Sequence, residues 1–415
     1  MSGLVHVIGA GLAGLAAATK LAGQGRRVRL YEAARMAGGR CRSYFDQQLG
    51  LTIDNGNHLL LACNHAANAY LARIGAKDAL SGPDACVFDF YDLAAHEKWR
   101  LQPNAGRLPW WIFSPSRRVP DTRLTDYFGA LALLRADDEA RVAQVLKPQG
   151  PLWDRLWKPV LVSALNTPLD LASARLAAQI VRESLGAGGL AARPRIPAHG
   201  LGAAFIAPAL AFLNAAGADI RFGARLRGLR FDGERARALD FGDETIEIGE
   251  DETIIFAAPA WSALELIPGI SAPNEHRAIF NAHFAVAPPP DMPLATGVVG
   301  AMSEWLFAFP DRLSVTISAA DDFIEKAPED IGLAIWREAA AIAGLDAAKI
   351  PAMRIVKEKR ATFSATPAQD ALRPRPQTRW RNLVLAGDWT QTGLPATIEG
   401  AIRSGDRAAE LIARI

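Results

Sequence analysis

Residues 4–32 read LVHVIGAGLAGLAAATKLAGQGRRVRLYE, and this stretch decides the fold. An apolar run from Leu4 to Ile8 is followed by closely spaced glycines, then by a helix-forming segment over residues 15–25, and then by a second apolar run that ends at Glu32. A strand, a helix and a strand within about 30 residues have the size of one βαβ unit. The sequence therefore predicts such a unit at the start of the chain.

The spacing Gly9-x-Gly11-x-x-Gly14 predicts a nucleotide-binding turn, because it follows a strand and opens a helix. In such a turn Gly9 bends the chain, Gly11 lets the backbone approach a pyrophosphate, and Gly14 lets the helix and strand pack closely. The partial positive charge of the helix N-terminus favours the diphosphate. Glu32 is placed to accept hydrogen bonds from a ribose hydroxyl. This pattern predicts a dinucleotide, and it fits NAD as well as FAD.

Two further stretches favour FAD. Shortly after the acidic residue come Gly38-Gly39-Arg40-x-Arg42, which combine close backbone contact with an arginine that can face phosphate. At the other end of the chain, residues 385–405 read LAGDWTQTGLPATIEGAIRSG. Both stretches resemble the flavoproteins of the amine oxidase and phytoene desaturase type. The resemblance implies one flavin site that is built from both ends of the chain.

The same resemblance implies roles for residues of the closing stretch. Asp388 is expected to hydrogen-bond the ribityl chain, and the backbone at Thr397, Ile398 and Glu399 is expected to direct a helix start at the flavin N1–C2=O edge. A helix N-terminus stabilises the negative charge of a reduced flavin near N1. We expect noncovalent FAD, because the closing stretch has no cysteine or histidine, and we expect no metal. The other expected cofactor contacts are Leu12, Ala13, Ala33, Asn55, Gly56, Asn57, His58, Leu226, Ala258 and Gly387.

The fold class that follows is α/β, with a Rossmann-like FAD-binding domain interleaved with an α+β substrate domain, as in the amine oxidase and phytoene desaturase type. The predicted FAD-binding parts are residues 1–75, 201–261 and 376–415. The predicted parts of the substrate domain are residues 76–200 and 262–375.

Several segments are predicted to complete these domains. Residues 252–258 and 382–386 are expected to be strands, and residues 396–415 are expected to contain a helix. Residues 220–241 alternate apolar and polar, which predicts antiparallel strands with turns at Gly223, Gly228 and Asp232-Gly233. The uncharged stretch 200–218 has the length of a transmembrane helix. Its glycines, proline and asparagine favour a buried helix instead.

Composition and charge exclude other classes of protein. Of 415 residues, 50% are hydrophobic and 22% are charged, which is the composition of a globular protein large enough for two domains. A formal net charge of +2 gives no electrostatic reason to bind nucleic acid. Cys41, Cys63 and Cys86 show no metal-ligand spacing and suit a reducing compartment. The first residues lack the basic segment of a signal peptide, so we expect a cytoplasmic protein.

Three stretches are similar to the hydroxysqualene dehydroxylase family: residues 54–58 (DNGNH), residues 152–176 (LWDRLWKPVLVSALNTPLDLASARL) and residues 193–210 (RPRIPAHGLGAAFIAPAL). The similarity implies that reduced FAD removes the hydroxyl group of a C30 isoprenoid alcohol, hydroxysqualene, to give squalene for hopanoid biosynthesis. Relatives tend to have glutamine where this chain has Asn57, which shortens a polar arm near the expected flavin face.

This reaction requires an acid, because an allylic alcohol forms a carbocation once its leaving oxygen is protonated, and a hydride then completes the reduction. His58 is the first candidate, since its ordinary pKa allows both protonation states near neutrality. The alternative for His58 is a structural or flavin-contact role. Asn166 is a second candidate that can approach the substrate hydroxyl, and its alternative role is a turn before Pro168.

A C30 isoprenoid barely dissolves in water, so we expect the enzyme to take its substrate from the inner face of the cytoplasmic membrane as a peripheral protein. Residues 107–123 group aromatic side chains with arginines, which suits the headgroup boundary. The alternative is that these aromatic residues pack over a core or line a pocket. The predicted membrane contacts are Trp110, Trp111, Ile112, Phe113, Arg117 and Arg118.

Two other functions fit the same motifs. A carotenoid-type FAD-dependent desaturase uses the same flavin face and an apolar tunnel, with electrons flowing in the opposite direction. A non-catalytic escort protein carries an isoprenoid, but it has no need of Asp388 or of the helix start at residues 397–399. A dehydroxylase also needs an electron donor for FAD, which the sequence does not identify.

Overall fold

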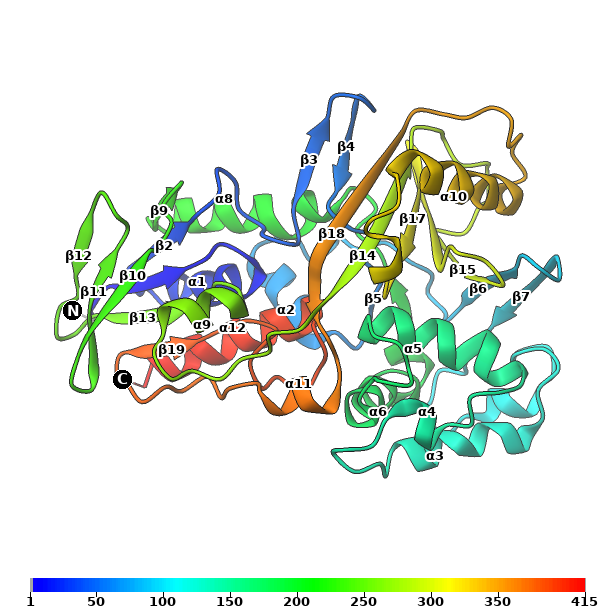
Figure 1. The fold of residues 1–415 in the computed structure, drawn as a ribbon, viewed down its shortest axis with the longest axis horizontal. Helices are drawn as coiled ribbons and strands as arrows, with labels where there is room; N and C mark the ends of the chain where they lie inside the picture. The colour runs from blue at the N-terminus through cyan, green and yellow to red at the C-terminus, as the bar shows by residue number, and fades with distance from the viewer. Residues whose placement is uncertain (1–2, 415) are drawn as a thin grey trace.

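A parallel five-stranded sheet forms one end of the molecule in a computed structural model that describes residues 3–414 (Figure 1). All its neighbouring strands pair in parallel, in the order β19-β13-β1-β2-β9. The strands are β1 (Val5–Ile8), β2 (Val28–Glu32), β9 (Asp219–Phe222), β13 (Thr253–Phe256) and β19 (Leu383–Leu385). The opening and closing stretches of the chain therefore share one sheet, as expected of the α/β class.

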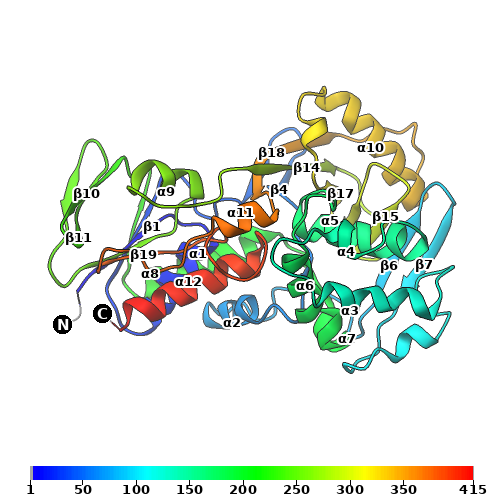
Figure 2. The same cartoon turned by 60° about the horizontal axis from the view of Figure 1, so that its bottom comes forward.

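Two helices cover this sheet side by side. Helix α1 (Leu12–Gly23) and helix α12 (Ile398–Ile412) approach so closely that a Cβ atom on Gly405 would lie 2.1 Å from the carbonyl oxygen of Ala13. Because α1 lies between the sheet, α12 and α8 (Ala207–Ala215), it is buried on most sides and is rich in alanine. Figure 2 shows α12 running along this layer toward the C-terminus.

The segment 220–241 differs in part from its prediction. Strand β9 pairs in parallel with β2, so it belongs to the five-stranded sheet. Gly228 begins strand β10 (Gly228–Asp232) and makes no turn, whereas the predicted turn at Gly233 is confirmed between β10 and β11 (Arg235–Asp240). An alternating pattern does not distinguish parallel from antiparallel pairing. The pairing of β9 depends on the strand that it joins, which is β2 at its open edge.

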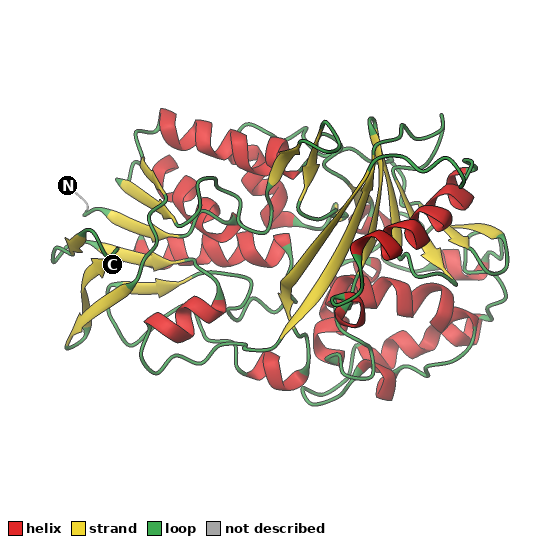
Figure 3. Ribbon diagram, turned by 45° about the horizontal axis from the view of Figure 1, so that its top comes forward, coloured by secondary structure: helices red, strands yellow, loops and turns green. Residues whose placement is uncertain are grey.

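The other end of the molecule is a seven-stranded sheet in the order β18-β14-β17-β16-β15-β6-β7. Side chains alternate between its two faces: Trp305 and Phe307 of β16 pack against helices α5 and α6, and Leu306 packs toward α10. Figure 3 shows the helices around this sheet. The strands are β6 (Phe88–Asp92), β7 (Glu97–Leu101), β14 (His276–Phe284), β15 (Ala295–Val299), β16 (Trp305–Phe309), β17 (Arg312–Ile317) and β18 (Met353–Phe363). The covering helices are α3 (Gly129–Leu133), α4 (Val142–Val145), α5 (Lys158–Leu165), α6 (Ala174–Glu183) and α10 (Pro328–Ala343).

Short elements connect the two sheets or extend from them. The hairpin of β3 and β4 leads directly into residues 55–58, which lie between the two ends of the molecule (Figure 1). The remaining elements are β3 (Ser43–Asp46), β4 (Leu51–Asp54), β5 (Leu60–Leu61), α2 (His65–Arg73), α7 (Gly189–Ala192), β8 (Pro194–Arg195), β12 (Thr245–Glu247), α9 (Ala260–Leu266), α11 (Pro367–Ala371), the short helices η1 (Trp110–Phe113), η2 (Leu124–Phe128), η4 (Leu185–Ala187) and η6 (Asp321–Phe323), and the π-helical turns η3 (Trp153–Trp157) and η5 (Gly202–Ile206).

The uncharged stretch 200–218 is divided between η5 and α8, and part of it is buried in the core beside α1. Within residues 3–414, the structure has no helix of the length and hydropathy needed to cross a bilayer. The predicted helix is therefore present but only partly buried: Ala209 and Leu213 of α8 face the core, whereas Ala211 and Asn214 are exposed.

Candidate active site

The turn between β1 and α1 has the geometry of an anion cradle. Gly9 has φ +105°, and its N–H donates to the carbonyl oxygen of Tyr31 at 2.7 Å. A Cβ atom on Gly14 would lie 1.8 Å from the carbonyl oxygen of Gly9, so the helix start packs directly on the turn. A Cβ atom on Gly11 would meet nothing within 4 Å, and no side chain caps the first turn of α1. The first N–H groups of α1 are therefore available beside an open space, which is what a diphosphate needs.

A second glycine turn lies against the first. The N–H of Gly38 donates to the carbonyl oxygen of Ala10 at 2.8 Å, and a Cβ atom on Gly39 would lie 3.4 Å from the Cα atom of Gly11. Both glycines have positive φ, at +111° and +56°, which other residues rarely adopt. The two predicted glycine motifs thus meet at Gly11.

The carboxylate of Glu32 stabilises these turns by hydrogen bonds to the backbone. One carboxylate oxygen accepts the N–H of Ala10 and the other accepts the N–H of Ala34, each at 2.8 Å. Each oxygen keeps a further lone pair for a hydroxyl donor. Glu32 is partly exposed and Ala33 is exposed beside it, so both predicted contacts remain accessible.

Arg40 and Asp388 join the two ends of the chain. Nη2 of Arg40 lies 2.7 Å from both carboxylate oxygens of Asp388, and Nη1 donates to the carbonyl oxygen of Ala361 at 2.7 Å. The Asp388 side chain is buried, whereas 40% of the Arg40 side chain is exposed. Asp388, followed by Glu358, raises the pKa of Arg40 against the opposing effect of burial. The exposed part of a permanently charged guanidinium is therefore left for an anionic ligand.

Arg373 supports this closing loop and was not predicted from the sequence. Its fully buried guanidinium donates to the carbonyl oxygens of Thr390 and Asp388 at 2.8 and 3.0 Å and pairs with Asp370 at 2.9 Å. Nothing in the motif LRPRPQ around it distinguishes Arg373 from a surface arginine. Gly387 is fixed on the other side, where its N–H donates to Oγ of Ser404 at 2.8 Å.

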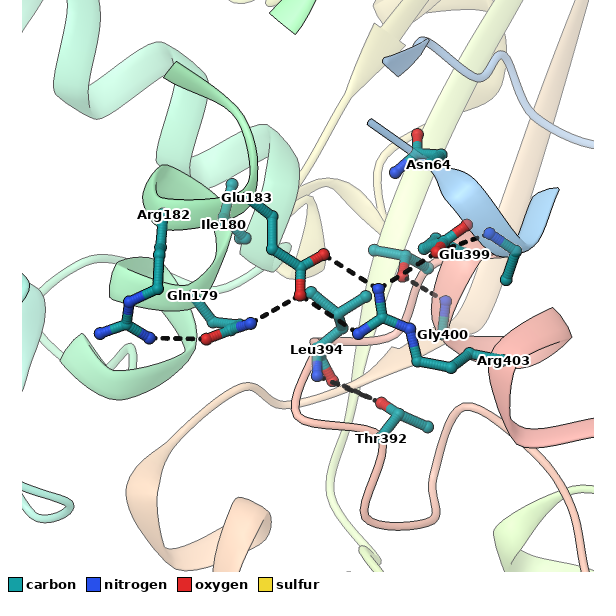
Figure 4. Close-up of polar contacts among 12 residues, drawn as sticks. Asn64, Gln179, Ile180, Arg182, Glu183, Thr392, Leu394, Glu399, Gly400 and Arg403 are labelled. Carbon is teal, nitrogen blue, oxygen red and sulfur yellow. Dashed lines mark hydrogen bonds and ion pairs between the residues drawn. The ribbon is translucent and has the colours of Figure 1, made fainter. Parts of the chain in front are cut away.

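The start of α12 is anchored to two other helices. Thr397 caps α12, since its Oγ1 accepts the N–H of Gly400 at 3.0 Å. The Glu399 carboxylate accepts the N–H groups of residues 66 and 67 in α2 at 3.0 and 2.9 Å. It also pairs with Arg403, which reaches Glu183 of α6 at 2.9 Å (Figure 4). The Glu399 side chain is thus structural, and only its backbone stays a candidate flavin contact.

The predicted contacts at residues 55–58 lie against the seven-stranded sheet. Nδ2 of Asn55 donates to Glu358 at 3.0 Å. The Asn57 side chain donates to Oγ1 of Thr316 and accepts from Oγ of Ser314, both at 3.0 Å. A Cβ atom on Gly56 would lie 3.3 Å from the side chain of Asn281, so this loop fits tightly on β14 and β17.

Comparison with known proteins identifies the family. The model of the flavin-containing amine oxidoreductases matches residues 12–413. A hydroxysqualene dehydroxylase from Rhodopseudomonas palustris is 53% identical over 413 residues, which are 99% of each chain. Another from Sinorhizobium fredii is 47% identical and covers 98% of this chain and 97% of its own. The chain belongs to the hydroxysqualene dehydroxylase family. The structure of putrescine oxidase bound to putrescine, with a TM-score of 0.70, 17% identity and 100% coverage of both chains, shows the shared fold.

Membership of the hydroxysqualene dehydroxylase family makes the chain a flavin-dependent oxidoreductase and confirms the resemblance that its motifs carry. The pairing of Arg40 with Asp388 and the contact of the two glycine turns are therefore features of a flavoprotein. Leu226 is buried in the core beside the five-stranded sheet, and the carbonyl oxygen of Ala258 accepts Nε1 of Trp389 at 3.0 Å.

The surroundings of the two predicted catalytic residues of this hydroxysqualene dehydroxylase family member favour their alternative roles. Desolvation, together with Arg40, lowers the pKa of His58 to about 4. His58 is then neutral at pH 7 and has no imidazolium proton to donate. Asn166 is buried with φ +48° at the end of α5, where Nδ2 donates to Oγ1 of Thr362 at 2.9 Å and Oδ1 accepts the N–H of Ala319 at 2.6 Å. Its geometry favours the alternative role, a turn before Pro168.

The predicted membrane segment also needs correction. Trp111 and Ile112 are buried in the core under η1, whereas Trp110 and Phe113 are 64% and 58% exposed. The segment alternates in this way because a 3-10 turn directs only some of its side chains inward. Leu108 adds a further exposed apolar side chain. Arg117 and Arg118 are partly exposed and donate to the carbonyl oxygens of residues 102 and 112.

Proposed function

We propose that this chain catalyses the FAD-dependent reductive dehydroxylation of hydroxysqualene to squalene. The observation that carries the proposal is the contact of Arg40 Nη2 with both carboxylate oxygens of Asp388, which joins the opening glycine turns to the closing loop before α12. The hydroxysqualene dehydroxylases of Rhodopseudomonas palustris and Sinorhizobium fredii match nearly the whole chain, so the substrate region is included in the similarity.

The open cradle at Gly11 and the uncapped start of α1 fit the diphosphate of FAD, and Glu32 fits its ribose. Arg40 and Asp388 fit the polar chain between the diphosphate and the ring, and the start of α12 fits the N1 edge. We propose noncovalent binding, with residues 1–75, 201–261 and 376–415 as the FAD-binding domain and residues 76–200 and 262–375 as the substrate domain. When bound and reduced, FAD supplies the hydride.

The rest of the chemistry falls to the substrate region. An isoprenoid needs an apolar wall, and we propose that this wall belongs to the apolar region between the seven-stranded sheet and helices α5 and α6, whose core includes Trp305, Phe307 and Phe309. An apolar wall excludes the water that would otherwise capture a carbocation. A group that protonates the leaving hydroxyl is also required.

We further propose that the protein takes its substrate from the inner face of the cytoplasmic membrane as a peripheral protein. Trp110 and Phe113, with Leu108 beside them, form an exposed apolar patch next to Arg107 and Arg117. Apolar and aromatic side chains flanked by arginines suit the headgroup region of a bilayer.

Anaerobic mixing of photoreduced enzyme with hydroxysqualene tests the function. We expect a single-turnover return of the oxidised flavin absorbance, with one squalene formed per flavin as measured by mass spectrometry. Bleaching of oxidised flavin by a polyene precursor would instead show a desaturase. Binding of isoprenoid by a purified protein that takes up no flavin would show an escort protein.

A further inference from the structure

Glu304 lies where the loop at residues 55–58 meets the seven-stranded sheet. It directly precedes β16, where its N–H donates to the carbonyl oxygen of Thr316 at 3.2 Å and its carbonyl oxygen accepts the N–H of Val298 at 2.8 Å. The hydroxyl of Thr316 also accepts Nδ2 of Asn57 at 3.0 Å. Glu304 is therefore separated from the loop at residues 55–58 by a single residue of β17.

Hydrogen bonds also fix the turn before Glu304, at Met302 and Ser303. The Glu338 carboxylate, from α10, accepts the N–H groups of Met302 and Ser303 at 2.9 and 2.8 Å and the hydroxyl of Ser303 at 2.6 Å. The backbone of Glu304 is thus held from α10, β15 and β17. Such support keeps a side chain in one place without a rearrangement during the reaction.

The carboxyl group of Glu304 is surrounded by neutral donors. The N–H of Ser318 donates to its Oε2 at 2.7 Å. The hydroxyl of Ser163, from α5, is a second polar group that acts on the carboxyl, and its Oγ accepts Nε1 of Trp305 at 2.8 Å. Among the described residues, no arginine, lysine or histidine forms an ion pair with Glu304 within 4 Å, and Lys158 acts on it only through its charge.

Burial without a cationic partner makes Glu304 a carboxylic acid near neutral pH. Desolvation raises its pKa to about 7 against the opposing effects of Ser318, Ser163 and Lys158. Part of the surface of residue Glu304 as a whole is nevertheless exposed. Glu304 thus has the proton that neutral His58 lacks.

Asn166 contributes by holding the adjacent turn. Ala319 has φ +47°, which is rare for a residue other than glycine, and its N–H donates to Oδ1 of Asn166 at 2.6 Å. The N–H groups of Ser318 and Ala319 therefore point to Glu304 and Asn166 respectively. We read Asn166 as a positioning residue that fixes the donor to Glu304.

We propose that Glu304 is the catalytic acid that protonates the hydroxyl group leaving the substrate. This inference rests on the proposed dehydroxylation. The O–H bond of Glu304 breaks and its proton passes to the hydroxyl oxygen; the C–O bond breaks with its electron pair, and water leaves. Reduced FAD, when bound, would supply the hydride to the allylic carbon, and a proton from solvent would restore the acid. The Ser318 N–H and the Ser163 hydroxyl stabilise the carboxylate that forms.

Glu304→Gln tests the proposal, because the amide keeps the acceptor for Ser318 but has no acidic proton. We expect the single-turnover rate of flavin reoxidation by hydroxysqualene to fall about 100-fold or more, with unchanged flavin content and substrate binding. The wild-type rate should decline above pH 7, and this decline should vanish in the variant. Glu329→Gln, which removes an exposed carboxylate of α10, is the matched control with the wild-type rate.

A second measurement needs no substrate. In an infrared pH titration, the wild-type protein should show a protonated carboxyl C=O band that disappears with a midpoint near pH 7. Glu304→Gln should lack this band and Glu329→Gln should keep it. If the glutamine variant does not fold, Glu304→Asp should keep the pH dependence and react more slowly, since its acid is one methylene shorter.

The outcomes separate the two proposals. Wild-type enzyme that is not reoxidised by hydroxysqualene would overturn the proposed function. Wild-type enzyme that is reoxidised, with Glu304→Gln within about threefold of its rate, would overturn only the role of Glu304. A carboxyl band unchanged in Glu304→Gln would overturn the assignment of the protonated group.

Discussion

Two glycines at the start of α1 separate cofactor binding from folding, and replacing each by alanine tests the nucleotide site. A Cβ atom on Gly14 would lie 1.8 Å from the carbonyl oxygen of Gly9, whereas ordinary contacts begin at 3.4 Å. The helix and the turn must therefore separate by about 1.6 Å (3.4 minus 1.8 Å) in Gly14→Ala. Overpacking of this kind costs about 1–3 kcal/mol. We expect Gly14→Ala to lower the free energy of unfolding of the flavin-free protein by this amount.

Gly11→Ala should have the opposite profile. Its Cβ atom meets nothing within 4 Å, and Gly11 has φ −74°, which alanine readily adopts. The free energy of unfolding should change by less than about 1 kcal/mol, the scale of an N-cap substitution. The new methyl group points into the space assigned to the diphosphate, however. We expect FAD to bind about 100-fold more weakly, which corresponds to ~2.7 kcal/mol.

Urea unfolding of the flavin-free variants gives the free energy of unfolding. Titration of each variant with FAD, monitored by the quenching of flavin fluorescence, gives the affinity for FAD separately. Wild-type FAD affinity in Gly11→Ala would refute the placement of the diphosphate at this turn. Wild-type stability in Gly14→Ala would refute the close packing of α1 on the turn. Equal effects of both variants on stability and binding would show that the turn acts only as a folding element.

Three further predictions follow from single features of the structure. The double variant Trp110→Ala/Phe113→Ala should float less with anionic liposomes, and Ile350→Ala, which removes another exposed apolar side chain, should float as the wild type does; equal flotation of all three proteins would exclude the patch. Asp388→Asn should lower the free energy of unfolding of the flavin-free protein by about 1.5–3 kcal/mol, since it removes the charge that pairs with Arg40, and urea unfolding checks this. Glu304→Gln should raise Tm at pH 8 and leave it unchanged at pH 4. The pKa of Glu304 is 4.5 in the unfolded chain and about 7 in the folded protein. The wild-type protein therefore loses stability, at most about 3 kcal/mol, as the pH rises through this window. A Tm gain that is the same at both pH values would contradict the raised pKa.

The sequence by itself determined the nucleotide-binding unit, because each step of that inference is local. The glycine spacing, the strand before it and Glu32 after it lie within one βαβ unit, where covalent order fixes spatial order. The closing stretch at residues 385–405 was assigned to the same site by its resemblance to known flavoproteins. The structure brings Asp388 to Arg40 as that assignment requires.

Tertiary structure alone decided the pairing of β9, the exposure of residues 110–113 and the ionisation of the candidate acids. A period-2 pattern is the same for parallel and antiparallel strands, and it does not indicate that β2 has an open edge to which β9 can pair. Proton affinity depends on burial and on neighbours far apart in sequence: Arg40 beside His58, and Ser163 and Ser318 around Glu304. The sequence around His58 and Glu304 therefore predicts neither pKa shift, and Glu304 is proposed as the acid from its tertiary surroundings.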